Sequence, residues 1–114
     1  MFTDFKDKEI YKKAKELYSL VNDSLTADVP RPLKDQILRA AISIILNFSE
    51  GYGRYTKNDK KHFYITARAS LNETATCFDL VLLHSKLDES KIKKLNDLVE
   101  ELSKMISGLI NSQK

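Results

Sequence analysis

The sequence contains few of the residues that interrupt or cross-link a chain. Among 114 residues there are one cysteine, three glycines, two prolines and no tryptophan. A single cysteine excludes an intramolecular disulfide, and the position of Cys77 between Ala75 and Phe78 predicts a small buried hydrophobe. Because turn residues are scarce and no strand alternation with hairpin turns occurs, we expect a few long elements.

The sequence also lacks a long apolar run. The longest one, residues 40–46, is interrupted by Ser43 and is too short to cross a bilayer. The first residues are charged from Asp4 onward and do not resemble a secretion signal. We therefore expect no contact with membranes and a cytoplasmic location. An apolar content of 42% and a charged content of 31% predict one soluble domain over residues 1–114.

Apolar residues instead recur at intervals of three and four, which is the period of amphipathic helices. The pattern predicts an all-α protein with helices at about residues 5–25, 33–50, 57–85 and 88–111. Short connections between four helices of this kind favour an antiparallel up-down-up-down four-helix bundle.

The expected helix boundaries rest on a few residues. Pro30 lies in a polar loop, residues 26–32, that separates the first two helices. The segment Gly51-Tyr52-Gly53 is expected to close the second helix, because glycine tolerates the left-handed backbone found at helix ends. Thr56 resembles an N-cap, with Asp59 in the first turn behind it, and Asp88 resembles the N-cap of the last helix.

The second predicted helix is apolar on more than one side between residues 40 and 48. A helix at the corner of a bundle needs only one buried face, so the surplus suggests a second contact. We expect Ile42, Ile45 and Leu46 to form an interface between subunits. The alternative is a central helix around which the rest of the chain wraps.

Positive charge is concentrated in one segment. Residues 54–68 contain five cations and one acid, a net charge of +4, whereas the whole chain carries +3. Cations on one helical face contact phosphates, and tyrosines between them stack on unpaired bases. The predicted nucleic-acid-binding residues are Arg54, Lys57, Lys60, Lys61, Tyr55 and Tyr64. Tyr64 also begins the apolar stripe of the third helix, and a merely solvated charged face is the alternative.

Several polar residues lie beside the predicted core. In an antiparallel pair, the end of the second helix lies beside the start of the third, so these side chains are expected to form a structural polar network that sets the packing. Its members are Asn47, Glu50, Arg68, Ser70 and Glu73. No nucleophile has an adjacent base, and the Glu-x-x-His pairs of di-iron bundles are absent. We therefore expect no enzymatic activity, no metal and no cofactor.

Three motifs resemble a known family. They are Gln36-x-x-Arg39-Ala40-Ala41-x-Ser43-Ile44, Asn47-x-x-Glu50-Gly51-Tyr52-Gly53-Arg54 and Phe63-x-x-x-Ala67-Arg68-Ala69-Ser70-x-x-Glu73. In order and spacing they are similar to the four-helix-bundle proteins encoded by bacterial ribosomal RNA intervening sequences, and to the related accessory protein of diversity-generating retroelements. The resemblance implies a cytoplasmic homo-oligomer, a pentamer in the family, that binds RNA or DNA through a basic surface. It implies no established enzymatic activity.

Two functions follow as expectations. The first is a homo-oligomeric bundle that binds nucleic acid through the basic segment, where repetition in a ring would strengthen a weak contact by avidity. The second is a protein-interaction scaffold that uses the apolar face of the second helix, with another protein such as a nucleic-acid enzyme as its partner.

Overall fold

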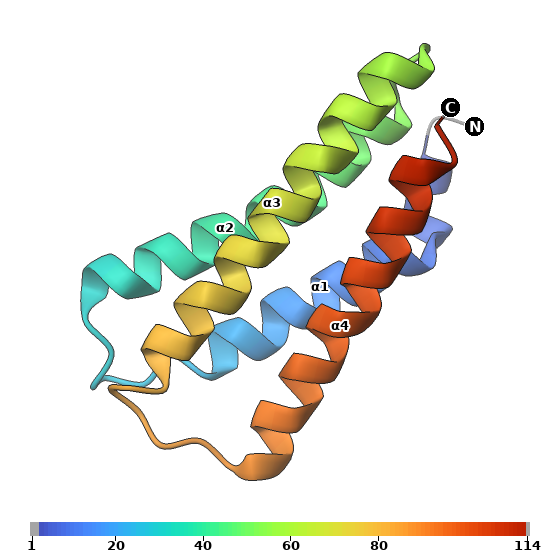
Figure 1. The fold of residues 1–114 in the computed structure, drawn as a ribbon. Coiled ribbons are helices and arrows are strands. Elements are labelled where there is room, and N and C mark those ends of the chain that lie inside the picture. Colours follow the sequence, from blue (N-terminus) through green and yellow to red (C-terminus); the bar gives the residue numbers. More distant parts are fainter. Residues whose placement is uncertain (1–2, 114) are drawn as a thin grey trace.

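The computed structural model describes residues 3–113 and is all-helical in that range (Figure 1). A short 3-10 helix, η1 (Asp4–Asp7), precedes four α-helices, which are α1 (Glu9–Asp23), α2 (Arg31–Tyr52), α3 (Lys57–Val81) and α4 (Glu89–Asn111). Consecutive helices are antiparallel, and α4 also packs against α1. The predicted all-α, up-down-up-down four-helix bundle is therefore confirmed.

The core lies along the axis of the bundle and receives one apolar stripe from each helix. Leu17, Ile44, Phe78 and Leu102, one from each of α1 to α4, are fully or almost fully buried. Each belongs to a row of buried residues spaced three and four apart, which is the pattern that predicted the helices. The burial of these rows supplies the main driving force for the fold.

Several helix boundaries differ from the prediction by two or more residues. The first helix is interrupted at Lys8, whose extended backbone separates η1 from α1, so that the ring of Phe5 packs edge-on against Tyr11. The second helix begins at Arg31, before Pro32. Proline is tolerated in the first turn of a helix, because the N–H that it lacks would have no partner within the helix there. The third helix ends at Val81, earlier than residue 85.

Gly51 has a different role from the predicted one. It lies inside α2, is buried, and like every described glycine has a negative φ, so no left-handed backbone closes this helix. A Cβ atom at this position would come within 2.7 Å of Cε1 of Tyr64 and 3.0 Å of Cβ of Phe63. The position therefore requires glycine because α3 approaches α2 closely, and not because the backbone turns.

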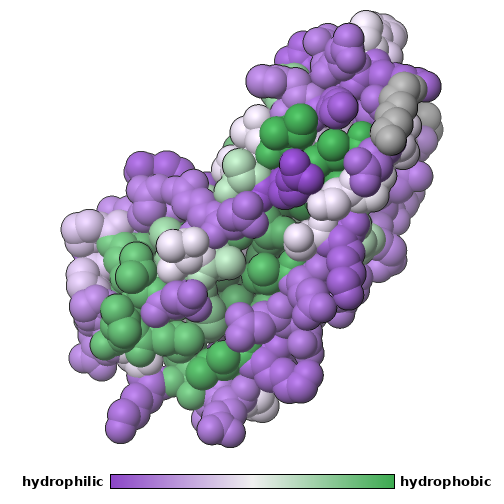
Figure 2. Space-filling model, in the orientation of Figure 1, coloured by the Kyte–Doolittle hydropathy of each residue, from purple (hydrophilic) through white to green (hydrophobic). Residues whose placement is uncertain are grey.

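The turn between α2 and α3 lies at one end of the bundle. We call residues 49–61 the hairpin tip. In Figure 1 the tip projects past the end of α4, and the first and last described residues lie at the same end. Figure 2 shows a mostly hydrophilic surface at this end and apolar surface at the opposite end. Leu80, in the last turn of α3, and Leu83, just beyond this helix, are exposed. The tip is thus a polar, accessible part of the molecule.

Candidate nucleic-acid interface

The backbone of the hairpin tip is fixed by local hydrogen bonds. The N–H of Gly53 donates to the carbonyls of Ser49 and Glu50 at 3.3 and 3.2 Å, which closes α2. The hydroxyl oxygen of Thr56 accepts a hydrogen bond from the backbone N–H of Asp59 at 3.1 Å, so the predicted N-cap of α3 is confirmed. Tyr55 stands between these two caps with its side chain fully exposed.

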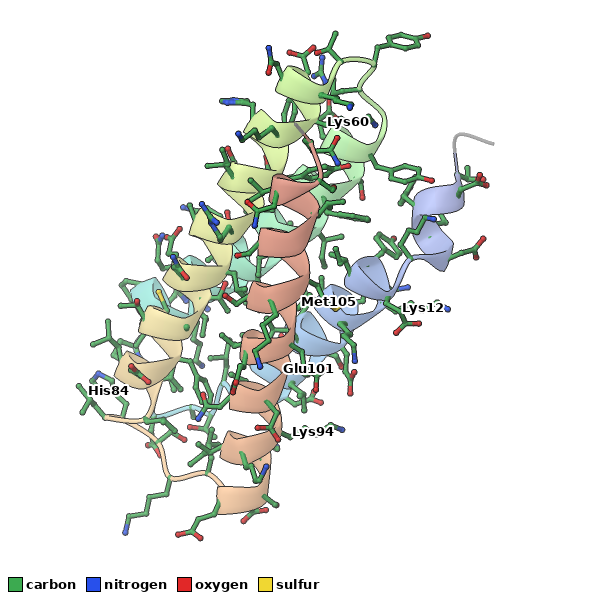
Figure 3. All side chains as sticks on the ribbon, turned by 45° about the vertical axis from the view of Figure 1, so that its right-hand side comes forward. Lys12, Lys60, His84, Lys94, Glu101 and Met105 are labelled. Atoms are coloured by element: carbon green, nitrogen blue, oxygen red, sulfur yellow. The ribbon has the colours of Figure 1, made fainter. Side chains whose placement is uncertain are left out.

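Lys60 is directed toward the end of α2. Its ammonium group donates to the carbonyl of Tyr52 at 2.8 Å and, more weakly, to that of Gly51 at 3.4 Å, and it lies 5.5 Å from the centre of the Tyr52 ring (Figure 3). A cation at the C-terminus of a helix satisfies carbonyls that have no helical partner and complements the helix dipole. Lys60, one of the predicted phosphate contacts, is therefore engaged within the protein.

Arg54 is exposed but also has partners inside the tip. Its Nη2 donates to Oε1 of Glu50 at 2.7 Å, and its guanidinium lies 4.7 Å from the centre of the Phe63 ring. The ion pair offsets part of the positive charge that the sequence places here. The ring contact fixes the orientation of the planar group.

Lys57, Lys61 and Arg68 lie along one side of α3. They are spaced by four and seven residues, which places them on one stripe of a helix. Lys57 is exposed, whereas Lys61 and Arg68 are half-buried, and Nη1 of Arg68 reaches the hydroxyl of Ser107 on α4 at 3.5 Å. We call these three residues the cation stripe. At Arg68 the stripe lies on the side of α3 that faces α4.

Tyr64 does not belong to the exposed surface. It is 2% exposed, and its ring stacks on Phe48 with the ring centres 6.1 Å apart. Burial, assisted by Tyr52, raises the pKa of its phenol above the ordinary value of 10.0. The prediction that Tyr64 stacks on bases is therefore wrong. The sequence also places Tyr64 in the apolar stripe of the third helix, and the burial of its ring agrees with that placement.

The predicted polar network is divided into separate contacts. Ser70 on α3 bonds to Ser43 on α2 at 2.7 Å, and the amide of Asn47 donates to the same Ser43 hydroxyl at 2.9 Å. The other three members each bond to a different residue outside the predicted set: Glu50 pairs with Arg54, Glu73 accepts a hydrogen bond from Gln36, and Arg68 contacts Ser107. Only Asn47 and Ser70 are joined, through Ser43.

A solvent-open hollow of about 500 Å³ lies at the hairpin tip. It is lined by the end of α2, the turn and the first turn of α3, namely by Ser49, Glu50, Gly53, Arg54, Tyr55, Thr56 and Asp59. The sequence assigns Asp59 only to the first turn of a helix, and no spacing shows that it shares a hollow with Glu50. The carboxylates line this hollow, whereas helical geometry turns the cation stripe to another side of α3.

The predicted subunit interface is exposed in part. Leu46 is 61% exposed and Ile42 is 39% exposed on the outer side of α2, while Ile45 is half-buried against the core. Ile65 on α3 is 41% exposed as well. The remaining apolar residues of this part of α2, such as Ala40 and Ile44, are buried in the bundle. The apolar surplus of α2 is thus smaller than the sequence suggests.

Other chemistry has little support among the residues that the structure describes. Within residues 3–113 no group of three or more His, Cys, Asp and Glu side chains is placed to hold a metal ion. Cys77 is buried, as predicted, and burial together with Glu73 raises the pKa of its thiol, which keeps it protonated and unreactive. In the same range no helix has the length and apolar character needed to span a membrane.

Comparison with known proteins places these features in a family. The family model of the 23S rRNA-intervening sequence protein matches residues 6–108, which include all of α1, α2 and α3 and most of α4. No curated protein matches the chain. The resemblance to the accessory protein of diversity-generating retroelements stays a prediction. Since the match covers nearly the whole bundle, the chain belongs to the 23S rRNA-intervening sequence protein family.

Proposed function

We propose that this protein is a non-enzymatic, homo-oligomeric helical bundle that binds RNA through the cation stripe and the hairpin tip. The observation that carries the proposal is the alignment of Lys57, Lys61 and Arg68 along one side of α3. Cations spaced along one face follow a phosphate backbone and displace its counterions, which makes such binding strong at low salt and weak at high salt. The name of the family, which refers to ribosomal RNA, favours RNA over DNA.

We infer that only some of the residues predicted from the sequence contribute to this binding. Lys60 is directed into the protein, Tyr64 is buried and Arg54 is paired with Glu50. We assign the principal phosphate contacts to Lys57 and Lys61, because they lie one helical turn apart on one side of α3 at its start, with Arg68 at the far end of the stripe. Tyr55 supplies an aromatic ring at the apex of the tip.

The test is fluorescence-anisotropy titration of a labelled RNA hairpin, and of a DNA duplex of matched sequence, across a salt series. The double variant Lys57→Gln/Lys61→Gln should bind RNA more weakly and reduce the slope of log K against log salt by about 1 to 2. Lys86→Gln/Lys93→Gln is the matched control, because it removes the same charge from exposed lysines near the opposite end. Equal effects of the two double variants would refute the assignment of the stripe.

A second function is favoured by the exposed leucine on α2. Leu46 and Ile42 lie one helical turn apart on the outer side of α2 and form a small apolar surface suited to another protein, including a second copy of the chain. Leu46→Asp should lower the mass measured by light scattering if this surface joins subunits. Leu83→Asp is the control, since Leu83 is even more exposed than Leu46 but lies beyond the end of α3. An unchanged mass for both variants would remove the surface as a subunit contact.

A further inference from the structure

The hollow at the hairpin tip combines opposite kinds of polar group. Glu50 and Asp59 contribute carboxylates that accept hydrogen bonds, and Arg54 contributes a guanidinium with several donors. The Arg54–Glu50 ion pair, 2.7 Å long, holds one acceptor and one donor group in a fixed relation. The hollow is therefore prepared for a ligand that presents donors along one edge and acceptors along another.

The carboxylates of Glu50 and Asp59 make this hollow unfavourable for binding a phosphate. Like charges at short range repel, and Arg54 balances only one of the two acidic groups. A neutral ligand with N–H groups meets no such repulsion. The phosphates of a bound strand are thus expected on the cation stripe, and a part of the strand without charge is expected in the hollow.

Tyr55 adds an aromatic surface at the edge of the hollow. Its side chain is 101% exposed, so both faces of the ring are accessible to a partner. Exposed aromatic rings in RNA-binding proteins stack on unpaired bases, whose edges are then read by hydrogen bonds. The hollow, about 500 Å³ in volume and open to solvent, lies directly beside this ring and is large enough for one base.

We propose that the hollow at the hairpin tip receives a single unpaired guanine of the RNA, stacked on Tyr55; this inference rests on the proposed RNA binding. Guanine carries a ring N–H and an amino group side by side, which together match a carboxylate such as that of Asp59. Its O6 and N7 acceptors match the guanidinium of Arg54. Uracil lacks the amino group and the N7 acceptor, so the hollow selects guanine over uracil.

The experiment compares two labelled RNA hairpins that are identical except for one loop position, which is guanine in one and uracil in the other. The wild type should bind the guanine hairpin about tenfold more tightly at the same salt concentration, which corresponds to one stacked and hydrogen-bonded base. Both hairpins should show the same salt slope, because the phosphate contacts are unchanged.

Variants of the tip assign the preference to the hollow. Tyr55→Ala should abolish the preference without loss of fold, because its ring is fully exposed, and Tyr55→Phe should retain it. Asp59→Asn should raise the affinity for both hairpins by removing a negative charge, yet it should reduce the ratio between them.

The outcomes separate this inference from the proposed function. A salt-dependent affinity that is equal for the two hairpins would overturn the guanine site and leave RNA binding intact. A preference that survives in both Tyr55→Ala and Asp59→Asn would overturn the site as well, because the base would then be read elsewhere. If neither hairpin binds at low salt, the proposed function and the guanine site both fail.

Discussion

The α2–α3 pair and the α1–α4 pair are held together by different kinds of contact. Between α2 and α3 the backbones approach closely at Gly51, and the hydroxyls of Ser43 and Ser70 bond across the contact. Between α1 and α4 the outer rim is charged, with ion pairs from Lys13 to Glu101 and from Lys94 to Glu16. Charged side chains of both helices, among them Lys94 and Glu101 on α4 (Figure 3), line a groove of about 360 Å³ at this rim.

The difference indicates which pair depends on the shape of individual residues. A contact built on glycine and serine tolerates little change in volume, because the space for a larger side chain does not exist. A contact with long charged side chains at its rim adapts, because these side chains move into solvent. The α2–α3 pair, which carries the hairpin tip, is therefore the more demanding half of the bundle.

The largest expected effect comes from filling the close approach between α2 and α3. Gly51→Val would place methyl groups where the ring of Tyr64 lies, and it should lower the free energy of unfolding by about 3 kcal/mol, as overpacking does. Gly53→Ala is the control, since a Cβ there meets only ordinary contacts and the backbone suits alanine. Urea unfolding measures both, and similar midpoints for the two variants would contradict the close approach at Gly51.

A smaller effect is expected from the hydroxyl pair of the same contact. A double-mutant cycle with Ser43→Ala and Ser70→Ala should give a coupling free energy of about 1 kcal/mol, the net value of one hydrogen bond. The cycle removes the difference in helix propensity between serine and alanine, which single variants would include. Additive single effects in urea unfolding would show that the two hydroxyls do not interact.

The buried phenol of Tyr64 makes the same pair sensitive to alkali. Its pKa is raised in the folded state above the ordinary 10.0, so the stability contributed by the neutral ring is fully present below pH 10.0 and is lost as pH rises through the folded-state pKa. The wild type should therefore lose stability above pH 10.0 more steeply than Tyr64→Phe. Tyr55→Phe, which changes an exposed phenol, should follow the wild type in urea unfolding at each pH.

The smallest effect is expected at the charged rim of the α1–α4 pair. Glu101→Gln removes the partner of Lys13, and it should lower the melting temperature slightly at low salt and not at all at high salt, because ions screen exposed pairs. Thermal unfolding at two salt concentrations measures this. If Glu101→Gln lowered the stability as much as Gly51→Val, or if its effect persisted in high salt, the α1–α4 contact would be as demanding as the α2–α3 contact.

The sequence predicts the bundle well because each helix carries one apolar stripe. The stripe that contains Leu95 and Leu102, for example, continues through Ile106, and all three residues are buried. The helix ends are harder to predict, since they depend on local interactions. The interruption at Lys8 leaves no signature in the apolar spacing, because the buried row of α1 begins only at Ile10.

The sequence draws attention to the segment that forms the turn and the start of α3, but it does not show how the individual side chains there are placed. Residues 54–68 contain the cation stripe and the second part of the hairpin tip, but the sequence does not show that Lys60 is directed inward. Lys60 caps α2 because the antiparallel return of the chain brings the end of that helix beneath it, and this depends on tertiary packing. The hollow that joins Glu50 and Asp59 depends on the same packing.

The positions of the chain ends and the order of the helices make the bundle suitable for circular permutation. The first and last described residues lie at the end of the bundle that carries the hairpin tip, and α4 packs against α1 (Figure 1). A circular permutant with a short linker between the original ends, and new ends between α3 and α4, should therefore keep the same arrangement of helices. In that molecule α4 and α1 would become a consecutive hairpin, and its new loop would lie at the same end as the hairpin tip, where a designed sequence could be displayed.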